Sequence, residues 1–221
     1  MSGQGLSADK ARALELTPVS RETETLLDRF VEVLLLATEH QNLIGPSTIP
    51  TVWTRHVADS LQLLALAPNA HTWVDFGTGA GFPGIPIACA LADRPGAMVH
   101  LVESVGKKAA FLREAVAAIG VPAQVHHMRA EDFPKSHGAS LGDSVDVVTA
   151  RAVSPLKVLF ELAFPLISRG AVGLFPKGQD VDAELTEAAR YWIIEAKKAP
   201  SKTSPEGAIV IVTGLSPRRG R

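Results

Sequence analysis

Apolar residues recur at two different spacings along this chain, and the change comes near residue 71. Over residues 20–38 they recur every three or four positions with charged residues between them, which predicts an amphipathic helix. A proline-containing loop follows at 42–51, and a second helix ends near residue 68. No regular spacing is visible over residues 1–19. We therefore expect a flexible N-terminal segment at 1–19 and a helical cap at 20–70.

Beyond residue 71, short runs of β-forming residues alternate with stretches at helical spacing. The predicted strands cover residues 72–76, 98–103, 123–129, 145–151, 171–176, 192–197 and 208–213. The predicted helices cover residues 83–92, 107–119, 155–167 and 180–191. This alternation predicts an α/β fold, with a doubly wound, mostly parallel seven-stranded sheet and helices on both faces. We expect this Rossmann-like domain at 71–214, with the last strand as an antiparallel edge, and a basic tail at 215–221.

The composition is typical of one large globular domain with an appendage. Of the 221 residues, 46% are hydrophobic and 20% are charged, which excludes disordered, collagen-like and disulfide-rich chains. No apolar stretch approaches the roughly 18 residues of a membrane span. The N-terminus lacks the pattern of a secretion signal, and a single cysteine cannot form an internal disulfide. We expect a cytoplasmic protein with no membrane partner.

Charge is distributed unevenly, although the formal net charge is only −1. The last 25 residues hold six basic side chains against one acidic side chain, Glu206. Such a segment is either a solvated terminus or a contact for phosphate groups. Composition therefore leaves RNA open as a partner, bound through local patches with an affinity that falls with salt.

A glycine-rich turn follows the first predicted strand, where open α/β sheets bind their ligands. It reads GTGAG over residues 77–81 and is preceded by Asp75. Glycines there allow a tight turn and close approach of the backbone to a ligand. The dinucleotide fingerprint needs glycine at the sixth position, where this chain has Phe82. The spacing is instead similar to that of class I S-adenosylmethionine methyltransferases; the alternative is a turn that needs positive φ and binds nothing.

Acidic residues follow the next two predicted strands. Glu103 ends the strand at 98–103, where a carboxylate can accept hydrogen bonds from both ribose hydroxyls of an adenosine. Ala130 and Glu131 come directly after the third strand, where a backbone amide and a carboxylate can contact an adenine edge. Each of these residues alone is also typical of a solvated strand end. Together with the glycine turn they favour an adenosine-containing cofactor.

The end of the fourth predicted strand narrows the kind of methyl transfer. Enzymes that methylate exocyclic amines resemble one another in an Asn or Asp followed by Pro-Pro and an aromatic residue, whereas this chain has Thr149, Ala150 and Arg151. Methylation at pyrimidine C5 needs a cysteine nucleophile, and Cys89 lies inside a predicted crossover helix. The seven histidines show no metal-ligand spacing, so we expect no metal.

The remaining chemistry suits a nucleophile with a free lone pair, such as guanine N7, which needs no general base. The enzyme would then accelerate methyl transfer by aligning the reactants, excluding water and stabilising the charge that moves onto the purine. An arginine bound to O6 and N7, the usual guanine contact, would block the reacting lone pair. We therefore expect the base to be recognised by its other edge or by stacking.

A wider set of residues, from about residue 42 to the last strand, matches a known family. It comprises Asn42, Leu43, Arg55, His56, Asp59, Ser60, the turn at 75–86, the block at 106–113, Ala130, Glu131, the segment at 149–152, Lys177 and Gly178. In these residues the chain resembles the RsmG (GidB) family of bacterial methyltransferases, which modify N7 of a guanosine in the decoding-centre loop of 16S rRNA. It departs from the family at Ile44, where a threonine is usual.

The resemblance implies a cofactor, a partner and a set of site residues. The cofactor would be S-adenosyl-L-methionine, and the partner would be 16S rRNA or the small ribosomal subunit. Independently of the resemblance, we expect the protein to act as a monomer. The residues implied in cofactor binding are Gly77, Gly79, Phe82, Glu103, Ala130, Glu131 and Arg151. The residues implied near the RNA or the methyl-transfer site, as catalytic residues, are Arg55, His56, Arg151 and Lys177.

Several of these residues have competing interpretations. Arg151 can pair with the cofactor carboxylate, with RNA phosphate, or structurally with Asp146 or Glu131. Arg55 and His56 can serve packing of the cap as well as catalysis. At the level of function, the alternatives are methylation of another RNA position or of a small molecule, and a non-catalytic cofactor sensor.

Overall fold

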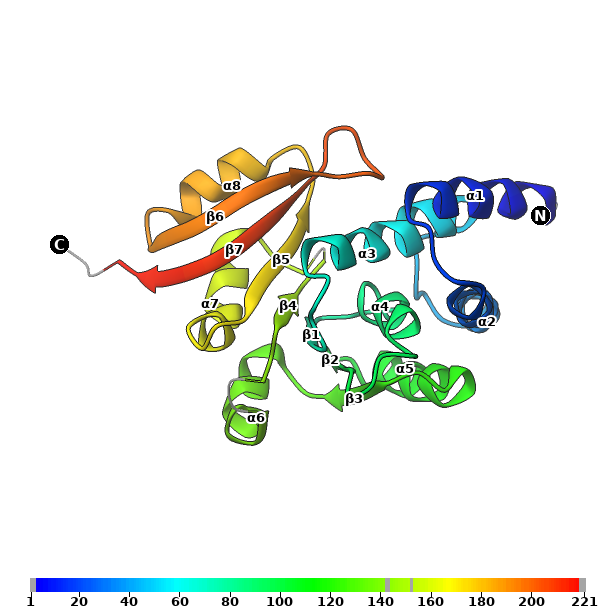
Figure 1. Ribbon diagram of the computed structural model, residues 1–221, viewed down its shortest axis with the longest axis horizontal. Coiled ribbons are helices and arrows are strands. Elements are labelled where there is room, and N and C mark those ends of the chain that lie inside the picture. Colours follow the sequence, from blue (N-terminus) through cyan, green and yellow to red (C-terminus); the bar gives the residue numbers. More distant parts are fainter. Residues whose placement is uncertain (1–2, 142–143, 152, 219–221) are drawn as a thin grey trace.

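The computed structural model describes residues 3–141, 144–151 and 153–218. Its centre is a seven-stranded sheet in the order β3-β2-β1-β4-β5-β7-β6 (Figure 1). The strands are β1 (Thr72–Phe76), β2 (Met98–Glu103), β3 (Ala123–His127), β4 (Val147–Thr149), β5 (Val172–Lys177), β6 (Trp192–Pro200) and β7 (Ala208–Pro217). The first five are parallel, and β7 runs antiparallel to both β5 and β6. This confirms the predicted doubly wound, mostly parallel sheet.

Helices cover both faces of the sheet (Figure 1). They are α4 (Gly84–Ala90), α5 (Gly106–Ile119), α6 (Phe133–Leu141), α7 (Leu156–Ile167) and α8 (Val181–Ala188). Successive residues of β1 enter different cores, because side chains alternate along a strand. Trp73 packs in the core shared with α4, α5 and the cap, whereas Val74 packs in the core shared with α6, α7 and α8.

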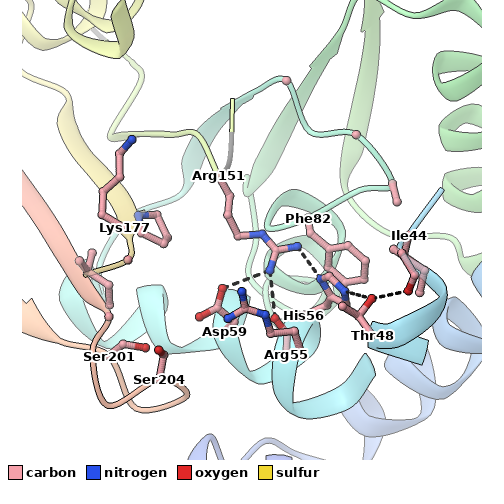
Figure 2. A pocket seen from close by; sticks show the side chains of 18 of the residues that line it. Ile44, Thr48, Arg55, His56, Asp59, Phe82, Arg151, Lys177, Ser201 and Ser204 are labelled. Atoms are coloured by element: carbon pink, nitrogen blue, oxygen red, sulfur yellow. Dashed lines mark hydrogen bonds and ion pairs between the residues drawn. The ribbon is translucent and has the colours of Figure 1, made fainter. Parts of the chain in front are cut away.

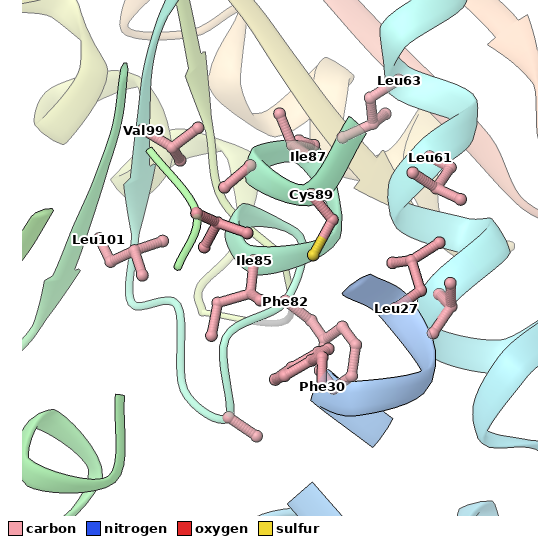
Figure 3. Close-up of a cluster of buried hydrophobic side chains, with 14 of the residues drawn as sticks. Leu27, Phe30, Leu61, Leu63, Phe82, Ile85, Ile87, Cys89, Val99 and Leu101 are labelled. Carbon is pink, nitrogen blue, oxygen red and sulfur yellow. The ribbon is translucent and has the colours of Figure 1, made fainter. Parts of the chain in front are cut away.

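The cap consists of α1 (Gly3–Leu16), α2 (Arg21–Thr38) and a helical stretch from 46 to 66. That stretch contains η1 (Pro46–Thr51), η2 (Trp53–Ala58), α3 (Asp59–Leu61) and η3 (Gln62–Leu66). Ser20 caps α2, since its hydroxyl accepts a hydrogen bond from the Thr23 amide at 3.1 Å. The apolar face of α2, with Leu27 and Phe30, packs against the residues that precede and form α4 (Figure 3). Packing against the sheet domain thus fixes the cap over the carboxyl end of β1.

Three sequence predictions are wrong in detail. Residues 3–16 form α1 rather than a loose segment, because Asp9 accepts hydrogen bonds from the amides of Trp53 (2.8 Å) and Thr54 (3.2 Å) at the start of η2. The last strand, β7, is antiparallel but lies between β5 and β6, so β6 is the edge. The predicted tail at 215–221 begins inside β7, which continues to Pro217, and residues 219–221 lie outside the described residues.

No helix in the described part of the chain is long and apolar enough to span a membrane.

Candidate active site

A cavity of about 800 Å³ opens at the carboxyl ends of β1 and β5. Its walls are the turn after β1, the cap from 43 to 59, and the loop at 201–207 that joins β6 to β7 (Figure 2). The sequence-predicted residues that line it are Arg55, His56, Gly77, Gly79, Phe82, Arg151 and Lys177. The structure therefore brings together, on one cavity, residues up to 122 positions apart in the chain. Glu103, Ala130 and Glu131 are not among its lining residues.

The glycine turn requires left-handed backbone at Gly77 and Gly79, where φ is +63° and +60°. This is the region that side chains other than glycine rarely adopt. A Cβ on Gly77 would lie 2.6 Å from Cγ2 of Val153, whereas a Cβ on Gly79 would meet only the Gly77 carbonyl at 3.8 Å. The turn is thus tightly packed at Gly77 and open at Gly79.

Asp75, the acidic residue before the turn, is a buried structural anchor. Its Oδ2 accepts a hydrogen bond from the Gly84 amide and its Oδ1 one from the Thr149 hydroxyl, both at 3.0 Å. Asp75 is only 1% exposed, and this burial raises the pKa of its carboxyl group to about 6. Asp75 therefore fixes the start of α4 and the end of β4 relative to β1.

Glu103 lies behind the turn, at the end of β2. Its Oε2 accepts a hydrogen bond from the Gly79 amide (3.0 Å), and its Oε1 accepts one from the Val105 amide (2.7 Å). A carboxylate offers about four acceptor positions, so each oxygen keeps capacity for another donor. Ala130 and Glu131 follow β3 in η4 (Ala130–Asp132), so they also lie at the carboxyl ends of the parallel strands.

Arg151 is held at the centre of the cavity wall (Figure 2). Its Nη1 donates to Asp59 Oδ2 and to the Arg55 carbonyl, both at 3.1 Å, and its Nη2 lies 2.8 Å from His56 Nδ1. The guanidinium carbon is 5.2 Å from the ring centroid of Phe82. The structural alternative for Arg151, an ion pair with Asp146 or Glu131, is not what the structure shows, because the carboxylate that pairs with Arg151 is Asp59. Asp146 instead accepts from the amides of residues 71 and 72, and Glu131 pairs with Arg129.

His56 is locked in one protonation state by its neighbours. Because arginine has only donors, His56 Nδ1 is the acceptor of the Arg151 hydrogen bond. The proton then sits on Nε2, which donates to Thr48 Oγ1 at 3.0 Å. The ring also stacks on Phe82, with centroids 4.9 Å apart. Burial, followed by the positive charges of Arg151 and Arg55, lowers the pKa of His56 to about 3, so the imidazole is neutral at physiological pH.

The basic residues around the cavity differ in whether they form ion pairs. Lys177 is largely buried, donates to the Ser154 carbonyl, and pairs with Glu184, each at 2.8 Å. The same Glu184 carboxylate accepts from the Leu156 amide at the start of α7. Lys177 thus connects β5 to the segment after β4. Arg55 and Lys108 line the cavity and make no ion pair with any residue that the structure describes.

Sequence reasoning did not assign roles to Asp59, Gln62 and the loop at 201–207. Asp59 Oδ1 accepts from Thr203 Oγ1 (2.6 Å), and Gln62 Oε1 accepts from the Lys202 amide (2.8 Å). These contacts join residues about 140 positions apart, which no local pattern indicates. Asp59 had one signal, its place beside Arg55 and His56 in the family resemblance.

Potential metal ligands and the single cysteine can be placed relative to the cavity. Nowhere among the described residues do three His, Cys, Asp or Glu side chains come together in a way that could hold a metal ion. Cys89 is buried in α4, and this burial raises its pKa to about 12. Its thiol therefore stays protonated and away from the cavity wall.

Comparison with known proteins identifies the family of this chain. Residues 23–208 match the family GidB, described as rRNA small subunit methyltransferase G. The chain belongs to this family. It is similar to a curated member, ribosomal RNA small subunit methyltransferase G of Bradyrhizobium sp. strain BTAi1, with 56% identity over 94% of this chain and 91% of that one. A member of the same name from Rhodopseudomonas palustris strain BisB18 is 54% identical over 96% of this chain and 89% of that one. The resemblance that the sequence suggested is confirmed.

Solved structures support the same fold at low sequence identity. An O-methyltransferase from Bacillus cereus in complex with SAH has a TM-score of 0.60 and 17% identity, covering 95% of this chain and 98% of that chain. A putative O-methyltransferase from Klebsiella pneumoniae has a TM-score of 0.55 and 16% identity, covering 95% and 97%. The class I methyltransferase fold expected from the sequence is confirmed for this GidB family member.

Proposed function

We propose that this protein transfers a methyl group from S-adenosyl-L-methionine to N7 of a guanosine in the decoding-centre loop of 16S rRNA. Membership of the GidB family supports the methyltransferase activity and the small-subunit rRNA substrate. The observation that carries the choice of N7 is the state of His56. Its imidazole is neutral and uses both nitrogens in hydrogen bonds to Arg151 and Thr48, so it is not poised to remove a proton. N7 is a nucleophile that needs no such step.

The residues at the end of β1 and β2 fit the cofactor. Gly79 leaves open space where a side chain would stand, and the Glu103 carboxylate beside it keeps acceptor capacity for ribose hydroxyls. When bound, S-adenosylmethionine supplies an electrophilic methyl group on a sulfonium centre. Ala130 and Glu131 stand at the same sheet edge, where they would contact the adenine. Gly77 and Phe82 would form the floor of the pocket.

Arg151 is the cation best placed for the reaction centre. Three hydrogen bonds and the Phe82 ring fix its guanidinium, which reduces the reorganisation needed when a charged group binds. Its charge is shared with Asp59, so it presents an oriented donor rather than a free cation. We assign it to orient the cofactor carboxylate or the substrate, with His56 as a positioning residue for Arg151 and Lys177 as a positioning residue for the segment after β4.

Arg55 and Lys108 are better suited to contact RNA. Both line the cavity, and neither is engaged in an ion pair within the described chain. Each phosphate contact of this kind makes binding weaken as salt rises. The near-neutral net charge means that affinity depends on such local groups. The proposal includes action as a monomer in the cytoplasm, on the small subunit or its rRNA.

A methyl-transfer assay tests this function. Labelled S-adenosylmethionine is incubated with the protein and with 16S rRNA or small subunits from a strain that lacks this methyltransferase, and the modified base is mapped. Label at guanine N7 in the decoding-centre loop is the expected result. Label at another base or on a small molecule would overturn the choice of substrate. Cofactor binding with no label on any RNA would indicate a sensor.

A further inference from the structure

Methylation at guanine N7 restricts how an enzyme can recognise the base. N7 must stay free to accept the methyl group, and O6 is its neighbour on the same edge. The opposite edge presents two donors, N1–H and the N2 amino group, which call for a pair of acceptors. A carboxylate is the side chain that supplies two acceptor oxygens without donors of its own. The residue that recognises this edge of guanine should therefore be a carboxylate that lines the cavity and has no hydrogen-bond or ion-pair partner within the protein.

Three carboxylates line the cavity: Asp59, Glu184 and Glu206. Asp59 is occupied by Arg151 on Oδ2 and by Thr203 and Gln62 on Oδ1. Glu184 is occupied by Lys177 and by the Leu156 amide. Glu206 is exposed at the cavity and has no hydrogen bond or ion pair with the residues that the structure describes. We propose that Glu206 recognises the N1–H and N2 amino edge of the guanine that is methylated.

Backbone hydrogen bonds support the loop that carries Glu206. The Ser201 amide donates to the Gly207 carbonyl and the Gly207 amide donates to the Ser204 carbonyl, both at 3.0 Å, so the loop at 201–207 closes on itself. Gly207 permits this closure, since a Cβ there would lie 3.0 Å from the Ser204 Cβ. A recognition residue needs this kind of support if it is to discriminate between bases.

The same loop is coupled to the reaction centre. Asp59 accepts from Thr203 of the loop through Oδ1 and from Arg151 through Oδ2. One buried carboxylate therefore sets the position of the loop relative to Arg151. Figure 2 shows Ser201 and Ser204 on the opposite side of Asp59 from His56. A base read by Glu206 would thus be held at a fixed place relative to Arg151.

This inference rests on the proposed function and deepens it by naming the residue that reads the base. The test uses 16S rRNA in which the target position carries either guanosine or inosine, assembled into small subunits. Inosine keeps N7, O6 and N1–H but lacks the N2 amino group. For the wild-type protein, kcat/KM should fall about 10- to 100-fold with inosine, as expected for loss of half of a paired contact. For Glu206→Gln, kcat/KM with guanosine should fall by a similar factor, and discrimination against inosine should shrink to less than about 3-fold.

Controls separate recognition from folding. Glu114→Gln, an exposed carboxylate on α5, should keep wild-type rates and wild-type discrimination. Glu206→Gln and Glu206→Asp should keep the wild-type melting temperature and cofactor affinity, since Glu206 is exposed. Wild-type kcat/KM and discrimination in Glu206→Gln would overturn the inference, as would a wild-type protein that does not distinguish inosine from guanosine. Failure of the wild-type protein to methylate guanosine N7 would instead overturn the proposed function first.

Discussion

His56 accepts a 2.8 Å hydrogen bond from Arg151 through Nδ1, and this direction fixes both the tautomer and the role of the imidazole. The ring is confined further by Thr48 on Nε2 and by Phe82 on its face. An imidazole held in this way supports the guanidinium beside it rather than exchanging protons with a substrate.

The first prediction concerns His56. His56→Asn offers a side-chain oxygen near the position of Nδ1 and should retain most of the activity, whereas His56→Ala should lose about 5- to 30-fold in kcat/KM, the value of one or two hydrogen bonds. Because the pKa of His56 is about 3, its ionisation should not appear in the pH–rate profile between pH 5 and 9. The measurement is kcat/KM against pH for the wild type and both variants. A limb near pH 6.5 that disappears in His56→Asn would contradict the assignment of a positioning role.

The second prediction concerns Arg151. Arg151→Ala should reduce methyl transfer by a factor on the order of 100 or more, as for removal of a preorganised donor from a reaction centre. Arg151→Lys should restore little, since a lysine cannot reach Asp59 and His56 with separate nitrogens. Single-turnover rates on small subunits measure this, with Arg113→Ala, an exposed residue of α5, as the control. If Arg151→Ala reacted at near wild-type rates, Arg151 would have a purely structural role.

The third prediction concerns the glycine turn. Gly77→Val should abolish detectable binding of S-adenosylmethionine, because φ is +63° there and a Cβ would lie 2.6 Å from Val153. The clash is with a neighbouring side chain, so the damage reaches the cofactor through displacement of the turn. Isothermal titration calorimetry gives the affinity. Gly5→Ala, in open space on α1, is the matched control and should bind as wild type does. Equal affinities for the two variants would exclude the turn as the cofactor site.

The fold was predictable because its signals are local. The strand bounds 72–76 and 98–103 were obtained from runs of β-forming residues, and the structure has β1 and β2 at these bounds. Helix α1 was missed because its stability comes from capping η2 through Asp9 rather than from its own sequence pattern. Helix α6 was not predicted either, because it is anchored by the buried side chain of Phe133, and this tertiary contact leaves no local sequence pattern.

The sequence indicated which residues belong to the candidate site, but it did not indicate which of their side chains contact one another. The end of each parallel strand indicated where ligands bind, and this was enough to nominate Gly77 and Glu103, whereas Arg151 was implied by the family resemblance. The partners of Arg151 were not predictable. Asp59 and Thr203 meet through a cap and a hairpin loop, and spacing within the sequence carries no information on that meeting.

Away from the cavity, His100 and His126 form a buried pair under α6, with His100 Nδ1 and His126 Nε2 3.0 Å apart. Burial, and then the neighbouring imidazoles, lowers the pKa of each to about 4. In the unfolded chain both would titrate near 6.5. The stability that the neutral pair contributes is therefore present above about pH 6.5 and is lost as the pH falls toward 4. The raised pKa of Asp75 acts in the opposite direction, since its neutral form is favoured in the folded state.

The fourth prediction uses this pair. His126→Gln removes one titrating group and leaves Asp75 unchanged, so Asp75 cancels from the difference between variant and wild type. The variant should be less stable at pH 7.5, because packing around Phe133 is lost. The gap in unfolding free energy should narrow by roughly 1–2 kcal/mol on going to pH 5, since only the wild type must keep His126 unprotonated. Urea denaturation at several pH values measures the gap, with exposed His40→Gln as the control. A gap that stays constant from pH 7.5 to 5 would show that His126 titrates normally in the folded protein.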